Sequence, residues 1–174
     1  MKQELSLWQF AGFTLTSLGG PRLHFLYEWT NKSILIAPFS GVNESTWEHM
    51  KLLFFPLLLF ALVQYRFFKD DRSFWCVKLA GATTGLILIP VIFYTYNGAF
   101  GKSPDWFNIT LFFIAAAVTF LLETWLFKKG FPTCKHPWIA FVILCAIGAV
   151  FVVFTFAPPR IPLFRDPLTG HYGV

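Results

Sequence analysis

The chain has 174 residues, of which 56% are hydrophobic, 20% aromatic and only 13% charged, and its mean hydropathy is +0.58. A soluble globular protein of this size needs far more polar surface, so the composition excludes the soluble classes. The formal net charge is +5, but the bases are scattered among short loops instead of forming one stripe, so we predict no nucleic-acid partner. The expected partner is the lipid bilayer.

Five apolar runs are each long enough to cross a hydrocarbon core, which is about 30 Å thick and takes roughly 20 helical residues. They cover residues 5–29, 50–68, 74–100, 106–127 and 138–157. Because the connections are short, we predict an all-α fold, a polytopic transmembrane helical bundle with five spans that forms a single integral membrane domain over residues 1–174. No small-residue cleavage pattern follows the first run, so we expect it to stay in the membrane.

The first run contains Gly19-Gly20-Pro21. Glycine lowers helix stability and proline removes a backbone donor, so we predict a break there, with one helix over residues 5–18 and a short one over 22–29. Two interpretations stay open. The break binds a ligand, as broken helices do in many transporters, or it only turns the chain onto the membrane interface.

Lysine and arginine cluster in two connections, at residues 66–72 and 128–135. The positive-inside rule predicts that both connections are cytoplasmic. With Lys2 and Lys78 on the same side, eight bases lie inside and six outside. We therefore expect a multi-pass protein of the cell (cytoplasmic) membrane with its N-terminus inside and its C-terminus outside.

The cysteines and the spaced glycines carry weaker signals. Cys76, Cys134 and Cys145 show neither an obvious disulfide pair nor a CxxC metal spacing, so we expect small buried hydrophobic side chains. Gly81 and Gly85 lie four residues apart in the third span, where spaced glycines permit close helix contact. Through these two glycines oligomerisation is possible.

The residues that suggest chemistry lie before and within the second span. Glu44 and Glu48 are four residues apart, as are His24 and Glu28, so each pair can share a helix face. Imidazole and carboxylate groups together are ligands for Zn, Mn or Fe. We predict a divalent metal ion as the cofactor, with His24, Glu28, Glu44, Glu48 and His49 as the metal ligands.

A structural interpretation competes with the metal site. Ser45-Thr-Trp-Glu48 is a capping box, in which Ser45 accepts a hydrogen bond from the amide of Glu48 and the Glu48 carboxylate accepts one from the amide of Ser45. Capping accounts for these two residues but for neither histidine.

Other polar residues are expected on the same membrane face. Pro56 and Pro90 should kink the second and third spans and open an aromatic-walled pocket near the outer face. The tail, residues 158–174, mixes apolar and turn-forming residues, so it is either an ordered cover over the site or a surface strap. The predicted ligand-binding residues are Arg22, Asn43, Tyr94, Asn97, Asp105, Asp166 and His171.

Two runs carry a family resemblance: His24-Phe-Leu-Tyr-Glu28, and the stretch from Pro38 to Pro56 that contains Asn-Glu-Ser-Thr-Trp-Glu-His. They resemble an uncharacterised family of small polytopic bacterial membrane proteins, of Firmicutes type, with an Asn-Glu-Ser-x-Trp-Glu-His motif. The resemblance covers most of the chain. It implies a bacterial membrane location and no particular activity.

The catalytic residues are unknown, because HExxH, CxxC, phosphate-loop and dinucleotide-binding motifs are all missing. Three functional classes remain. We predict small-molecule or ion binding and transport at an extracytoplasmic His/Glu site, because a broken helix and a one-sided polar face are typical of transporters. The alternatives are a membrane-embedded metal-dependent hydrolase and a non-catalytic accessory subunit.

Overall fold

The computed structural model describes residues 2–69, 71–130 and 134–174. Within these ranges the chain forms five α-helices and one short 3₁₀ turn, and its β-structure is one isolated bridge between Arg165 and Tyr172. The helices are α1 (Lys2–Trp29), α2 (Thr46–Phe68), α3 (Phe74–Phe100), α4 (Asp105–Lys129) and α5 (Pro137–Phe156), and the turn is η1 (Pro162–Phe164). The prediction of an all-α helical bundle is confirmed.

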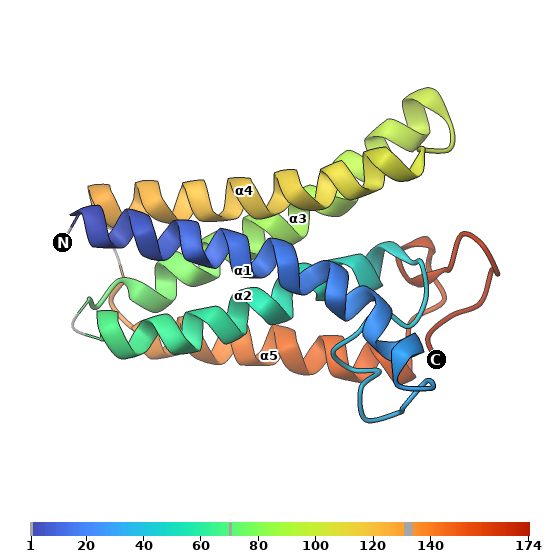
Figure 1. The fold of residues 1–174 in the computed structure, drawn as a ribbon, viewed down its shortest axis with the longest axis horizontal. Coiled ribbons are helices and arrows are strands. Elements are labelled where there is room, and N and C mark those ends of the chain that lie inside the picture. The colour runs from blue at the N-terminus through green and yellow to red at the C-terminus, as the bar shows by residue number, and fades with distance from the viewer. Residues whose placement is uncertain (1, 70, 131–133) are drawn as a thin grey trace.

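Consecutive helices run in opposite directions, and the two chain ends lie at opposite ends of the bundle (Figure 1). We call the end that holds the N-terminus the disulfide end, for a bond described below, and the end that holds the tail the tail end. α1 packs on α2 and α4, whereas α3 packs on α2, α4 and α5. Both base-rich connections therefore lie together at the disulfide end.

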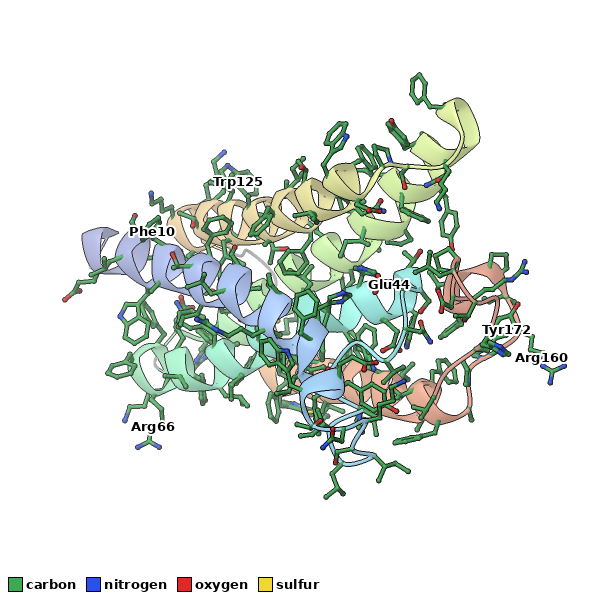
Figure 2. All side chains as sticks on the ribbon, turned by 45° about the vertical axis from the view of Figure 1, so that its right-hand side comes forward. Phe10, Glu44, Arg66, Trp125, Arg160 and Tyr172 are labelled. Atoms are coloured by element: carbon green, nitrogen blue, oxygen red, sulfur yellow. A yellow bond between two sulfur atoms is a disulfide. The ribbon has the colours of Figure 1, made fainter. Side chains whose placement is uncertain are left out.

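In the described ranges, four helices, α2 to α5, are both long and apolar enough to cross a membrane. α1 is as long, with 28 residues, but its composition is more polar. Large apolar side chains cover the outside of the bundle: Phe10 of α1 is 66% exposed and Trp125 of α4 is 52% exposed (Figure 2). Such an apolar surface fits lipid and not water.

The predicted break at Gly19-Gly20-Pro21 is wrong, because α1 continues through it. Two contacts explain the continuity. Gly20 has no side chain, and the ring of Phe112 fills the space where one would lie. One turn later the hydroxyl of Ser40 donates to the carbonyl of Leu23 and accepts from the amide of Tyr27 at 2.9 Å. Tertiary contacts thus outweigh the local helix-breaking tendency.

The expectation of no disulfide is also wrong. Cys76, near the start of α3, is bonded to Cys134, which precedes α5, and their Cα atoms lie 6.1 Å apart. The two residues are 58 positions apart in sequence, so only the packing of α3 on α5 brings them together. Cys145 is unpaired and exposed.

Gly81 and Gly85 do not form a free oligomerisation surface. A side chain at Gly81 would collide with Glu123, and one at Gly85 would collide with Thr119. Both glycines therefore face α4 inside the bundle, where they allow close helix packing. The oligomerisation prediction is wrong for these residues.

Candidate metal centre

The candidate centre lies at the tail end, where three segments meet. His24 comes from the end of α1, Glu44 from the loop before α2, and His49 from the first turn of α2. The loop is held against α1 because the amide of Gly41 donates to the carbonyl of Leu23 at 3.3 Å. A side chain at Gly41 would come within 3.3 Å of His24 Nδ1, so glycine lets the loop lie directly on the imidazole.

The three side chains converge on one point. Nε2 of His24 lies 3.3 Å from Oε1 of Glu44, and Nε2 of His49 lies 3.6 Å from Oε2 of the same carboxylate. The two imidazole rings are 5.6 Å apart between centroids. One ligand atom from each residue lies within 4.8 Å of the others. Ligands about 2.0–2.1 Å from a tetrahedral metal lie about 3.3–3.4 Å from one another, close to the two distances between the Glu44 oxygens and the imidazole nitrogens. Ligand atoms as far apart as 4.8 Å would move closer together to bind one ion.

The orientation of His49 strengthens this interpretation. Its Nδ1 lies 2.9 Å from the carbonyl oxygen of Ser45. A carbonyl only accepts, so Nδ1 carries the proton and the lone pair of a neutral imidazole is on Nε2, which faces the Glu44 carboxylate. Two acceptors that face each other repel unless a proton or a cation lies between them. Metal-binding histidines commonly donate their other ring nitrogen to a carbonyl in this way.

The electrostatics of Glu44 favour its charged form. A hydrogen bond from His24 lowers the pKa of the Glu44 carboxyl below its ordinary value, burial opposes this shift, and the charge of His24 adds to it. A carboxylate with a lowered pKa stabilises the fold above its unfolded pKa, and this contribution is lost as the pH falls through the lowered value. The ligand form of Glu44 is therefore the one present at neutral pH.

The capping interpretation is confirmed in one half. Ser45 Oγ accepts from the amide of Glu48 at 3.3 Å, and Asn43 Oδ1 accepts from the amide of Ser45 at 2.9 Å. The reciprocal bond of a capping box is missing, because the Glu48 carboxylate accepts instead from the amide of Val42 at 3.0 Å. These bonds fix the loop on both sides of Glu44.

Glu48 does not join the two histidines. Its carboxylate lies 2.6 Å from Nζ of Lys51, and both side chains are buried. Lys51 also donates to the carbonyl of Ala37 at 3.0 Å and to Thr155 Oγ1 at 2.8 Å. The pair therefore ties the loop, α2 and α5 together beneath the centre. The sequence interpretation missed Lys51, although its i,i+3 spacing from Glu48 is a detectable signal.

Glu28 is also outside the centre. Its side chain is 64% exposed and lies 3.6 Å from Nζ of Lys32, one helical turn away. The structure thus brings three of the five predicted metal ligands together and directs the other two to lysines.

The tail is ordered and packs on the loop and on α5. Asn43 Nδ2 donates to the carbonyl of Gly173 at 3.1 Å, and the amide of Val174 donates to the carbonyl of Thr155. Asp166 is buried, but it accepts from the amide of Leu168 and the hydroxyl of Thr169 and thereby shapes its own turn. Two other predicted ligand-binding residues, Arg22 and His171, are exposed.

Tyr94, Asn97 and Asp105 belong to a different region. They lie at the connection of α3 and α4, which projects away from the rest of the bundle (Figure 1). Asn97 Oδ1 accepts from the amide of Ser103 at 2.9 Å, so this side chain holds the connection, while Tyr94 and Asp105 are exposed. The structure does not bring the three residues to the histidines.

The apolar helices and the His/Glu group define a class: a small polytopic helical membrane protein with a candidate metal centre between a helix end and a loop. Over residues 1–174 the chain matches a family of unknown function (DUF6512). The chain belongs to this family, which confirms the resemblance at the level of an uncharacterised family. No curated protein and no solved structure matches the chain.

Proposed function

We propose that this protein binds a divalent transition-metal ion, of the Zn, Mn or Fe group, through His24, Glu44 and His49, and that it transports this ion across a bacterial cell membrane. The observation that carries the proposal is the convergence of three ligand atoms within 4.8 Å of one another. The bond from His49 Nδ1 to a backbone carbonyl supports it, because this bond directs the opposite nitrogen at the ion.

Transport is favoured over catalysis by the surroundings of the centre. Three protein ligands leave at least one coordination position open. An open position suits both an ion that enters and leaves and a metal-bound water that attacks a substrate, so a metal-dependent hydrolase is the second candidate. The interior of the bundle favours transport, because buried polar residues continue from His24 along α1 towards the opposite end.

The charge pattern supports an orientation with the N-terminus inside. Lys51 and Lys78 are buried in ion pairs, so they are not loop charges, and seven bases then stand against five. The disulfide gives the opposite signal, because such bonds are commoner in oxidising compartments than in the cytosol. We expect the charge pattern to determine the orientation, so that the tail end is extracytoplasmic.

Labelling of intact cells with an impermeant maleimide tests the orientation. The positions are exposed ones, Leu168 in the tail and Arg72 at the disulfide end. We expect Leu168→Cys to react and Arg72→Cys to be protected until the cells are broken. The reverse pattern would place the candidate centre in the cytoplasm.

Metal binding is tested by element analysis of the purified protein and by calorimetric titration with Zn²⁺. Removal of a hydrogen-bond partner of a metal ligand costs 10–100-fold in affinity, so His49→Ala and Glu44→Gln, which remove ligands, should each cost at least about 100-fold. His171→Ala is the matched control, because His171 is an exposed histidine at the same end. Absence of Zn²⁺, Mn²⁺ and Fe²⁺ binding by the wild type would leave the accessory-subunit class.

A further inference from the structure

The face of α1 that turns into the bundle lacks large apolar side chains over most of its length. It carries Gln9, Gly12, Thr16, Gly20 and His24, which are three or four residues apart and so lie on one side of the helix. Gln9 and Thr16 are 3% and 0% exposed, yet neither the amide nor the hydroxyl has a hydrogen-bond partner. Unpartnered buried polar atoms are rare, and such atoms commonly bind water or an ion.

This face ends at a second buried ion pair near the disulfide end. Nζ of Lys78 lies 2.6 Å from Oε2 of Glu123, and both side chains are fully buried. Oε1 of Glu123 has no partner. Four phenyl rings lie 5.5–6.0 Å from Nζ, those of Phe60, Phe74, Phe120 and Phe127. The pair is therefore held in an aromatic shell.

Two amides accompany the pair. Gln9 lies beside Glu123, but neither of its amide atoms reaches the geometry of a hydrogen bond. Gln64 of α2 is fully buried with both amide atoms unpartnered, and it lies one helical turn from Phe60. We call Gln9, Gln64, Lys78 and Glu123 the inner cluster. It offers three oxygen atoms without partners: the free carboxylate oxygen of Glu123 and the two amide oxygens.

We propose that the inner cluster is a second cation site, in which the Lys78 ammonium occupies the place of the transported metal ion and gives it up when that ion arrives. This inference rests on the proposed transport function. Oxygen ligands suit hard divalent ions such as Mn²⁺. Between transport events, the Lys78 ammonium neutralises the Glu123 carboxylate that would bind the ion. This pairing matters because an unpaired charge in this position is costly.

The exchange of the Lys78 ammonium for the metal ion releases one proton. An incoming M²⁺ ion binds Glu123, one N–H bond of the Lys78 ammonium breaks, and its electron pair stays on Nζ. The proton leaves to the aqueous phase at the tail end, by the route through which the ion arrived, and Lys78 regains a proton from the disulfide end after the ion has left. Within the described residues the other buried charged side chains, those of Glu48, Lys51 and Asp166, lie at the tail end, so Glu123 is the acidic group that faces Lys78. Loss of the proton lowers the net charge in a medium that disfavours charge.

The route between the two sites is closed in this structure. His24 and Gln9 are 15 residues apart on α1, which is roughly 22 Å along a helix axis. Rings of Phe60 and Phe120 close on Gly12, and the ring of Phe112 closes on Gly20. Aromatic constrictions of this kind gate pores by excluding water. Passage of an ion requires these rings to move away from the glycines.

The test uses the full chain reconstituted in liposomes that contain a metal-sensitive dye and a pH-sensitive dye. We expect an inward gradient of Zn²⁺ or Mn²⁺ to drive metal uptake together with proton movement in the opposite direction. Glu123→Gln should reduce both fluxes at least about tenfold and change the affinity for Zn²⁺ at the tail end less than about twofold. Glu28→Gln, an exposed carboxylate, is the control and should transport normally.

A double variant guards against misfolding. Lys78→Met/Glu123→Met replaces both charges by apolar side chains, a change that is often neutral for stability. Its binding of Zn²⁺ reports that the fold and the tail-end site are intact, and we expect no metal uptake. Transport by the double variant at the wild-type rate, or metal uptake by the wild type without proton flux, would overturn the inference. Failure of the wild type to bind metal or to take it up would instead contradict the proposed function.

Discussion

The candidate metal centre at the tail end and the Lys78–Glu123 pair at the disulfide end hold their charged groups in opposite ways. At the tail end Glu44 and both histidines are partly exposed and come from a loop and two helix ends. At the disulfide end Lys78 and Glu123 are fully buried and come from the interiors of two helices. The first arrangement can exchange a ligand with water. The second can change only if the helices around it move.

The same difference decides what each end contributes to stability. A partly exposed charge keeps much of its hydration, so its loss costs little folding energy. A buried pair has lost its hydration, so each charge depends on its partner. We therefore expect variants of the buried ion pairs to affect the fold, and variants of the partly exposed centre to affect binding.

Breaking the buried pair should have the largest effect. Lys78→Met leaves the Glu123 charge without a partner, which costs about 3–5 kcal/mol in other proteins. Lys78→Met/Glu123→Met should cost much less, because no unpaired charge remains. The free energy of unfolding in detergent, measured for both variants, checks this. Equal destabilisation by the single and the double variant would mean that packing, and not charge, dominates at this position.

The disulfide should contribute the next largest effect. It encloses α3 and α4 in a loop of 58 residues, and bonds that close loops of this kind contribute about 2–4 kcal/mol. We expect Cys76→Ser/Cys134→Ser to lower the free energy of unfolding by this amount, with the loss confined to non-reducing conditions. In wild-type protein alkylated before reduction, neither cysteine should be labelled. Full labelling of both would show that the bond is absent in the cell.

These two features mark the limit of what the sequence could predict. Apolar length placed the second to fifth helices within about four residues of their observed bounds. The sequence also grouped His24, Glu44 and His49 in one site, but its i,i+4 pairs joined them to Glu28 and Glu48, which lie outside the centre. The Cys76–Cys134 bond and the continuity of α1 through Pro21 depend on contacts between distant segments, and no periodic pattern encodes those. Pairing of Lys78 with Glu123 likewise depends on the register of α3 against α4.

At the tail end, variants of Glu48 and of its neighbour His49 distinguish a residue that stabilises the fold from a residue that binds the metal ion. Zn²⁺ at 100 times its dissociation constant should stabilise the wild type by about 2.7 kcal/mol, and His49→Ala should abolish this gain. Glu48→Gln should keep the gain, because Glu48 pairs with Lys51 outside the centre. It should destabilise the protein equally with and without chelator. Melting curves of the three proteins give the result, and loss of the Zn²⁺ gain in Glu48→Gln would place Glu48 among the ligands.

The smallest effect is expected for the exposed pair of Glu28 and Lys32. It has the same charges as the buried pair of Lys78 and Glu123, but both side chains are more than 60% exposed and their atoms are 3.6 Å apart. Exposed i,i+4 pairs contribute about 0.3–0.5 kcal/mol. Glu28→Gln should therefore change the free energy of unfolding by no more than about 0.5 kcal/mol, and Zn²⁺ affinity should stay within about twofold. A larger loss of affinity would mean that Glu28 turns towards the histidines when the ion binds, and that the centre has four protein ligands instead of three.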